Sequence, residues 1–220
     1  MNAQDSSSFQ VLWWNVENLF DCEHDSLKND YEFLPQSIRH WTHYRLKKKL
    51  HRIVQTIVEI GKWNPPALIG LCEVENDHVL TLLTKYSALK NLQYRYVMTH
   101  SDDLRGIDVA LLYQRDQFKL ITNEVIAAPT YNGKPTRDIL HVSGIILSLD
   151  TLDVFLCHLP SLIGGKAATE HRKQVTTLLK EKVDSVIIQR NHPNVMVMGD
   201  FNSDLSSPVF TQILTVNDPV

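Results

Sequence analysis

The chain has 220 residues, of which 43% are hydrophobic and 21% are charged. This length and composition are typical of a single soluble globular domain, which we expect over residues 1–220. The formal net charge of −3 provides no overall attraction to nucleic acid or to an anionic membrane, and no apolar run approaches the roughly 20 residues of a transmembrane helix.

The N-terminus bears on the cellular compartment, and the cysteine spacing bears on metal binding. Residues 1–8 are polar and lack the apolar segment of a signal peptide, so we expect a cytoplasmic protein. An exported chain whose leader has been removed is the alternative. The three cysteines lack metal-binding spacing, and we expect them to be buried free thiols.

Short apolar runs alternate with longer amphipathic segments along the chain. Apolar residues at helical spacing predict helices at residues 37–60, 76–88 and 169–189, and Pro208 opens a short last helix. Several of the middle strands follow one another without helices between them, and this order favours two packed sheets flanked by helices. Strands are predicted at residues 9–14, 67–72, 94–99, 108–113, 118–125, 139–149, 153–159 and 195–198.

A basic cluster lies within the first predicted helix. Because Leu46 and Leu50 would bury the opposite side, we expect the cluster to be a solvated helix face. A DNA-binding module built on this helix is the alternative, and it predicts strongly salt-dependent binding without metal. The cluster consists of Arg45, Lys47, Lys48, Lys49 and Arg52.

Polar groups gather where the predicted strands end. Four apolar strands run directly into a carboxylate, an amide or an imidazole, and two more strands begin after arginine and aspartate. If these two run antiparallel to the first four, all of the polar groups meet at one edge of the sandwich, as active-site residues usually do. The residues are Asn15, Glu17, Glu73, His158, Asp200 and Asn202 at strand ends, and Arg105, Asp108, Arg137 and Asp138 at strand starts.

These residue types favour one chemistry. Carboxylates and amides form a site of hard oxygen ligands, and Mg²⁺ needs only one or two protein carboxylates together with a substrate phosphate. No cluster of Cys and His of the kind that zinc prefers is present. Arginines such as Arg105 and Arg137 can bind phosphate oxygens in a bidentate manner.

The motifs resemble those of the endonuclease/exonuclease/phosphatase superfamily, the deoxyribonuclease-like metal-dependent phosphoesterases. They occur in the family's order from Trp14 to Asn202, and the combination is far more specific than any single motif. They are the W-N-hydrophobic-acid motif at Trp14–Glu17, the glutamate motif Leu71–Glu73, the histidine strand at Cys157–Ser161 and the G-D-hydrophobic-N motif at Gly199–Asn202.

The resemblance implies a fold and a role for each residue. The implied fold is α/β, a four-layer α/β/β/α sandwich of two mixed, largely antiparallel sheets. Glu73 is the implied main metal ligand, with Glu17 and Asn15 close to the ion, and Asp200 orients or deprotonates the attacking water. Further implied roles are water or phosphate binding by Asn202, phosphate binding by His158, Arg137 and Arg105, and a supporting role for Asp108.

We therefore expect Mg²⁺-dependent hydrolysis of a phosphate ester, with Mn²⁺ as a possible substitute ion. Nucleic acid, a phospholipid and a small phosphate ester all remain open as substrates, because specificity lies in loops such as residues 21–35 and 131–135. The sequence does not indicate the oligomeric state. A non-catalytic interaction domain on the same fold is the alternative function.

The resemblance also implies a final Asp-His pair on a strand after Asn202. Only 18 residues follow Asn202 here, and no such pair occurs among them. We expect a fragment of a longer protein that lacks its C-terminal strands, with weak turnover and a tendency to self-associate. A natural short variant that uses other groups is the alternative.

Overall fold

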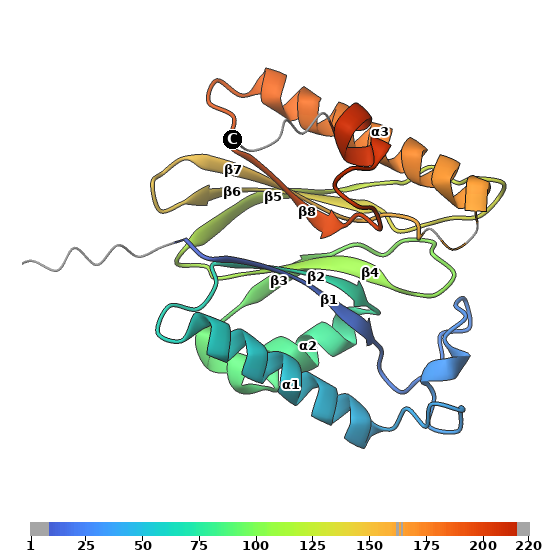
Figure 1. Cartoon of the computed structure of the whole chain (residues 1–220). Helices are drawn as coiled ribbons and strands as arrows, with labels where there is room; N and C mark the ends of the chain where they lie inside the picture. Colours follow the sequence, from blue (N-terminus) through green and yellow to red (C-terminus); the bar gives the residue numbers. More distant parts are fainter. Residues whose placement is uncertain (1–8, 162, 164, 215–220) are drawn as a thin grey trace, which may run out of the picture.

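Two four-stranded sheets lie face to face, and helices cover the outer face of each (Figure 1). The computed structural model describes residues 9–161, 163 and 165–214. Helices α1 (His43–Gly61) and α2 (Asp77–Lys85) cover the first sheet, and α3 (Gly165–Gln189) covers the second. The predicted four-layer α/β/β/α sandwich of mixed sheets is confirmed.

The first sheet has the strand order β1-β2-β4-β3. β1 and β2 are parallel because α1 carries the chain back across the sheet, whereas β4 runs antiparallel to both of its neighbours. β1 and β2 therefore end at the edge where β4 begins, as predicted. The strands are β1 (Val11–Leu19), β2 (Leu68–Val74), β3 (Arg95–Met98) and β4 (Asp108–Tyr113).

The second sheet has the strand order β5-β6-β7-β8. β5, β6 and β7 form antiparallel pairs, and β8 returns parallel to β7 after α3. In the part of the chain that the structure describes, β8 is an edge strand, and the strands expected beyond it stay a prediction. The strands are β5 (Phe118–Ile126), β6 (Ile139–Ile146), β7 (Thr151–His158) and β8 (Val195–Asp200).

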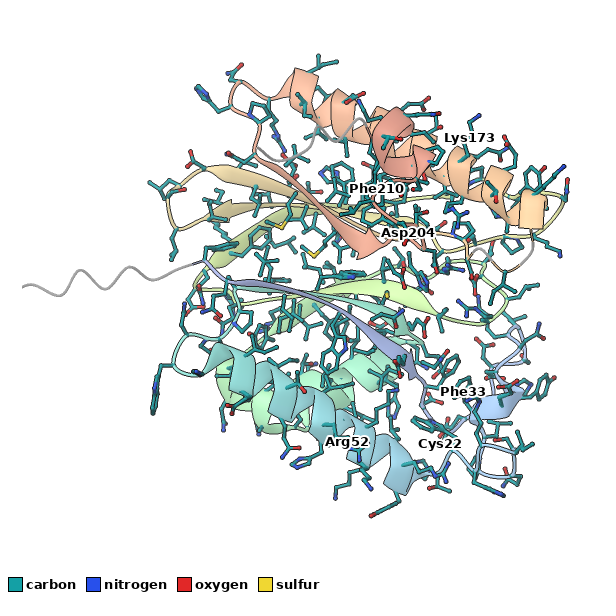
Figure 2. All side chains as sticks on the ribbon, in the orientation of Figure 1. Cys22, Phe33, Arg52, Lys173, Asp204 and Phe210 are labelled. Atoms are coloured by element: carbon teal, nitrogen blue, oxygen red, sulfur yellow. The ribbon has the colours of Figure 1, made fainter. Side chains whose placement is uncertain are left out.

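Apolar side chains fill the space between the sheets (Figure 2). Leu111 and Leu156, one from each sheet, are both fully buried there. Gly70 in β2 permits this close approach, because a Cβ atom at this position would lie 2.5 Å from Met198 Sδ and 2.7 Å from Trp13 Cε3. The tight packing holds the strand ends of the two sheets in a fixed relation.

The element boundaries differ from the predicted ones at a few places. α1 begins at His43 rather than Ser37, because turns hold the preceding segment; His40 N donates to Ser37 O at 2.9 Å. β1 continues past its predicted end to Leu19, and β6 stops at Ile146, where a turn begins. Short helices occur at η1 (Tyr31–Phe33), η2 (Ala88–Leu92) and η3 (Val209–Ile213), the last a π-helix that Pro208 precedes.

Other local predictions are confirmed. The Asn76 side chain caps α2 by accepting a hydrogen bond from Val79 N at 3.1 Å. All three cysteines are buried and free. Arg52 is exposed on α1 (Figure 2), and so are Arg45, Lys47 and Lys48, which fits a solvated helix face. No helix in the described part of the chain combines the length and the apolar character needed to cross a membrane.

Candidate functional site

The ends of β1, β2, β7 and β8 meet at one edge of the sandwich. The amide nitrogen Nδ2 of Asn15 donates to Glu73 Oε1 at 3.3 Å and to Asp200 Oδ2 at 3.0 Å. His158 pairs with Asp200 in the register of β7 and β8, and its Nε2 lies 3.8 Å from Asp200 Oδ2. The structure thus brings together four predicted site residues from four different strands and both sheets.

Three residues at this edge have unusual backbone conformations. Glu17, Glu73 and Asn202 have positive φ angles of 54°, 62° and 48°. This region costs a non-glycine residue about 1–3 kcal/mol and often occurs at functional sites. β1 and β2 each have a register shift at this point, so Glu73 is half-buried while Cys72 and Val74 on either side are fully buried.

A glycine and a turn position Asp200. A Cβ atom at Gly199 would lie 2.3 Å from Cys157 O, so only glycine lets β8 approach β7 this closely. In the turn that follows, Asn202 N donates to Asp200 Oδ1 at 3.0 Å, and Asn202 Nδ2 donates to Leu159 O at 2.9 Å. Both oxygens of the Asp200 carboxylate are therefore held, one by Asn15 and one by this turn.

His158 is a buried and neutral imidazole. Only 4% of the residue is exposed, and its Nδ1 has no hydrogen-bond partner among the residues that the structure describes. Burial lowers the pKa of His158 well below its usual value, the nearby Arg137 guanidinium lowers it further, and the Asp200 carboxylate opposes both effects. At neutral pH the ring can therefore donate one hydrogen bond and accept another.

The two predicted phosphate-binding arginines lie in different environments. Arg137 is 6% exposed and donates to His158 O at 3.2 Å, to Leu159 O at 2.8 Å and to Asp103 Oδ2 at 3.2 Å. The guanidinium thus already uses three of its five N–H donors to hold the loop after β7. Arg105 is exposed, with Nε 3.8 Å from Asp103 Oδ1. Phosphate binding by either arginine stays a prediction.

Asp108 and Asp138 support loops. The Asp108 carboxylate accepts hydrogen bonds from Thr99 Oγ1 at 2.6 Å and from Ser101 N at 3.1 Å, and these contacts fix the loop after β3. Asp138 Oδ1 accepts from Ala128 N at 2.8 Å. The structure places neither carboxylate in hydrogen-bond contact with Asn15, and the supporting role of Asp108 in the site stays a prediction.

Sequence reasoning missed two residues of the site. Lys49 is half-buried, unlike its basic neighbours, and its Nζ donates to Glu17 O at 2.5 Å. Burial lowers the pKa of Lys49, and the carboxylates of Glu17 and Glu73 oppose this effect, so its ammonium group lies near both predicted metal ligands. Asp103, which orients Arg137, lies in a loop with no sequence pattern that could have marked it.

The spacing of α1 contained a signal for Lys49. The residue lies three positions after Leu46 and four before Ile53, two buried residues of the apolar stripe. Helical residues at these spacings share a face, which places Lys49 at the margin of the stripe. Treating the basic cluster as one uniform solvated face was therefore wrong for Lys49.

The donor atoms at this edge fit a hard divalent cation. In the described residues, no group of three or more His, Cys, Asp and Glu side chains has the arrangement of a metal site. Mg²⁺ needs fewer protein ligands, since it binds through one or two carboxylates and keeps several waters. The carboxylates of Glu73 and Asp200 share the Asn15 amide, and a cation between such like charges would relieve their repulsion.

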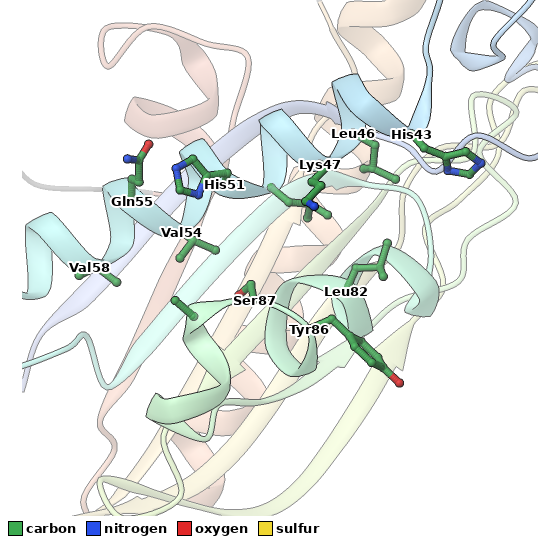
Figure 3. A pocket seen from close by; sticks show the side chains of 12 residues that line it. His43, Leu46, Lys47, His51, Val54, Gln55, Val58, Leu82, Tyr86 and Ser87 are labelled. Atoms are coloured by element: carbon green, nitrogen blue, oxygen red, sulfur yellow. The ribbon is translucent and has the colours of Figure 1, made fainter.

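Two hollows differ in their relation to this edge. A groove of about 510 Å³ lies between α1 and α2, where Leu46, Val54 and Leu82 line it (Figure 3). None of the predicted site residues in the described part of the chain lines that groove. A smaller cavity of about 330 Å³ adjoins the polar edge, since Arg137 and Pro160 belong to its walls.

The fold and the polar edge together define a class: an α/β/β/α sandwich with carboxylates, an amide and an imidazole at the ends of its parallel strand pairs. Residues 10–219 match the Endonuclease/Exonuclease/phosphatase family, and the chain belongs to this family of phosphoesterases and nucleases. No curated protein matches the chain.

Solved structures with the same fold include three with informative ligands or descriptions. The human Nocturnin catalytic domain with bound sulfate has a TM-score of 0.63 at 18% identity, over 93% of this chain and 68% of that chain. TDP2 from D. rerio with single-strand DNA product has a TM-score of 0.59 at 18% identity, over 92% and 63%. ANGEL2, a 2′,3′-cyclic phosphatase in complex with adenosine-2′,3′-vanadate, has a TM-score of 0.64 at 18% identity, over 92% and 56%.

At these identities the similarity shows the fold. The chain spans 56% to 68% of the length of these three solved chains.

Proposed function

We propose that this protein hydrolyses a phosphate ester with Mg²⁺ or Mn²⁺ at the edge formed by Asn15, Glu73 and Asp200. One observation supports the proposal above all others: a single amide holds carboxylates from both sheets together beside a buried neutral histidine. This arrangement has no evident structural use, because neighbouring like charges and positive φ angles both lower the stability of the fold.

Glu73 and Glu17 are the proposed metal ligands. Glu73 is fixed by its bulged strand and by the Asn15 amide, and Glu17 is exposed at the end of β1, where Asn15 Oδ1 accepts from its backbone N at 2.9 Å. An ion bound there would supply Lewis-acid polarisation of the phosphoryl oxygen and would stabilise the leaving oxygen. The Asn15 amide also bonds to Asp200, so it holds the end of β2, which carries Glu73, next to the end of β8, which carries Asp200.

Asp200 is the proposed group that orients and deprotonates water. Its carboxylate oxygens are held by Asn15 Nδ2 and Asn202 N, so little reorganisation is needed when a water binds. As the water oxygen forms its bond to phosphorus, the bond from phosphorus to the leaving oxygen breaks in line with it, and Asp200 accepts the proton that the water loses. Asn202 holds the turn that carries this carboxylate.

His158 and Arg105 contact the phosphate in this proposal, and Arg137 positions His158. A neutral imidazole donates a hydrogen bond to a phosphoryl oxygen as negative charge develops there. Arg137 keeps the His158 backbone in place through the carbonyl oxygens of His158 and Leu159. Arg105 is exposed in the loop before β4, and it is the proposed cationic contact for a substrate phosphate.

The test combines metal binding with turnover. A panel of phosphate monoesters and diesters should be hydrolysed with Mg²⁺ or Mn²⁺ and not with chelator. Glu73→Gln should lose both turnover and calorimetrically measured Mg²⁺ affinity, whereas Glu59→Gln, an exposed glutamate on α1, should match the parent. Unchanged Mg²⁺ binding by Glu73→Gln would refute the metal assignment.

The alternative is a non-catalytic interaction domain on the same fold. It predicts no turnover of any ester in the panel with either ion, although the protein is folded. The retained set of Glu73, His158, Asp200 and Asn202 favours the enzyme, since an interaction domain has no need of this combination.

A further inference from the structure

A cavity of about 330 Å³ lies between the loop that precedes β6 and the N-terminal part of α3. Tyr131, Thr136, Pro160 and His171 are among the residues that line it. We propose that this cavity binds the nucleoside part of a nucleotide ester, next to the phosphate that is cleaved. The inference rests on the proposed function and narrows the substrate to one chemical class.

The first wall of the cavity is a rigid aromatic pair. The Tyr131 and His171 rings stack with centroids 5.8 Å apart and an interplanar angle of 24°. His171 is 7% exposed, and a hydrogen bond of 2.7 Å between its Nε2 and Pro129 O fixes its ring. A planar base is suited to extend such a stack, because each base presents a flat π-face.

A tight turn holds Tyr131 in place. Asn132 and Gly133 have φ angles of 51° and 70°, as a two-residue type I′ turn requires. Tyr131 N donates to Lys134 O at 3.1 Å, and Lys134 N donates to Tyr131 O at 3.0 Å. Because the turn is closed by both bonds, little conformational freedom remains to be lost when a ligand binds.

A buried hydroxyl group supplies the polar contact. Thr136 lines the cavity with only 4% of its surface exposed, and its Oγ1 has no hydrogen-bond partner among the described residues. Buried polar groups are rarely left unpaired, so this hydroxyl indicates a missing partner. It can both donate and accept, and the polar edge of a base offers both kinds of group.

The remaining walls combine apolar and polar surfaces. Pro135, Pro160 and Ala168 contribute compact apolar surfaces, and Asn132, Lys134 and Ser161 contribute polar groups. A flat heterocycle needs apolar faces and a few polar contacts along its edge, and this cavity has both.

The cavity adjoins the proposed catalytic edge, because two arginines contact both. Arg137 lines it and also donates to the carbonyl oxygens of His158 and Leu159. Arg172 of α3 donates to Pro160 O at 3.2 Å and to Asn202 O at 3.0 Å, which ties the cavity wall to the Asp200 turn. In this proposal, a base held in the cavity has its own phosphate on the side of His158.

The experiment compares two chromogenic diesters that differ only in the group offered to the cavity. These are thymidine 5′-(4-nitrophenyl phosphate) and methyl 4-nitrophenyl phosphate, assayed with Mg²⁺. Tyr131→Leu and Thr136→Val should raise KM for the nucleoside ester roughly tenfold or more, with kcat nearly unchanged. Both variants should hydrolyse the methyl ester like the parent.

Matched variants separate this effect from a general loss of structure. Tyr131→Phe keeps the stacking ring and should keep the parent KM. Tyr86→Leu and Thr122→Val, both at exposed positions outside this cavity, should behave as the parent with either ester. An equal loss of kcat/KM for both esters, or an unchanged KM for the nucleoside ester, would overturn the inference.

A binding measurement separates this inference from the proposed function. AMP should bind the parent more tightly than inorganic phosphate does in calorimetry, and Tyr131→Leu should remove the difference. If AMP binds in this way and no ester is hydrolysed, the proposed function fails and the cavity assignment stands. If esters are hydrolysed and AMP binds no better than phosphate, the cavity assignment fails alone.

Discussion

The Asn15 amide donates to the Asp200 carboxylate at 3.0 Å, although 185 positions separate the two residues in the chain. The same amide reaches Glu73 at 3.3 Å, so Asn15 directly links the ends of the two sheets. Its other amide atom, Oδ1, accepts from Glu17 N. Asn15 therefore orients both carboxylates and the turn that carries the second proposed metal ligand.

We expect Asn15→Ala to lower kcat/KM for a phosphodiester by roughly 10–100-fold, the usual effect of removing a group that orients metal ligands. The affinity for Mg²⁺ should fall in the same range, because Asn15 no longer orients Glu73 and the turn at Glu17. Steady-state kinetics and calorimetric titration measure the two effects. Asn123→Ala, at an exposed position on β5, is the control and should behave as the parent. Parent-like kinetics for Asn15→Ala would show that Asn15 does not orient the carboxylates of the site.

Asp200→Asn should keep the fold and the metal affinity and remove most of the turnover. The change is nearly isosteric and removes the negative charge and the basicity that the proposed water activation requires. Asp204→Asn changes an exposed aspartate in the same segment and should retain full activity. Retention of more than about a tenth of the parent rate, a deficit under about 1.4 kcal/mol, would show that Asp200 does not activate the water.

The polar edge was predictable because each contribution is local to one strand end. An apolar run that stops at Glu73 or at Asp200 indicates both a buried strand and an exposed functional group. The antiparallel direction of β4 and β6 then brings the strand starts to the same edge. This reasoning needs no knowledge of side-chain contacts, and it gave the two sheets and the approximate position of each site residue.

The contacts within the site could not be predicted in this way. Whether Arg137 reaches a phosphate or holds a loop depends on Asp103, a loop residue whose place is fixed only by tertiary packing. Lys49 lies at the margin of an apolar stripe, where a small rotation of α1 decides whether its ammonium group faces solvent or the candidate site. The start of α1 was also misplaced, since turns before His43 compete with helix formation.

A second polar cluster ties α3 to the start of β7. Arg190 donates from Nε to Asp153 Oδ2 and from Nη2 to Asp153 Oδ1, both at 2.9 Å, and His141 Nε2 lies 3.0 Å from the same carboxylate. Only 1% of the Asp153 side chain is exposed. Arg190→Ala should therefore lower the free energy of unfolding by roughly 3 kcal/mol at pH 7, because a buried carboxylate loses its charged partner.

The effect of Arg190→Ala should depend on pH. Burial raises the pKa of Asp153, but hydrogen bonds from Arg190, Ser143 and His141 outweigh it, and the net pKa is lowered. A lowered carboxyl pKa gives stability that is present above the ordinary value near 4 and is lost as the pH falls further. Urea denaturation should show a smaller difference between parent and variant at pH 3 than at pH 7. Arg52→Ala, an exposed control, should change stability little at either pH.

Glu75 should make the protein less stable as the pH rises. Burial raises the pKa of its carboxyl group to about 8, the charges of Asp21, Asp30 and Asp25 add to this shift, and the hydrogen bond from Asp21 N opposes it. A carboxyl group whose pKa is higher in the folded state binds more protons there. Stability is therefore lost as the pH rises from the ordinary carboxyl value near 4 through about 8.

Glu75→Gln tests this dependence because glutamine resembles the protonated acid and still accepts the bond from Asp21 N. In chelator, the melting temperature of the variant should exceed that of the parent by a few degrees at pH 9, and the two should converge toward pH 5. Glu23→Gln removes an exposed charge from the same acidic region, and its melting temperature should differ from that of the parent by the same amount at pH 5 and at pH 9. The difference in melting temperature between Glu75→Gln and the parent could instead stay constant from pH 5 to pH 9. That result would show that Glu75 is ionised throughout this range and that the neighbouring carboxylates do not shift its titration.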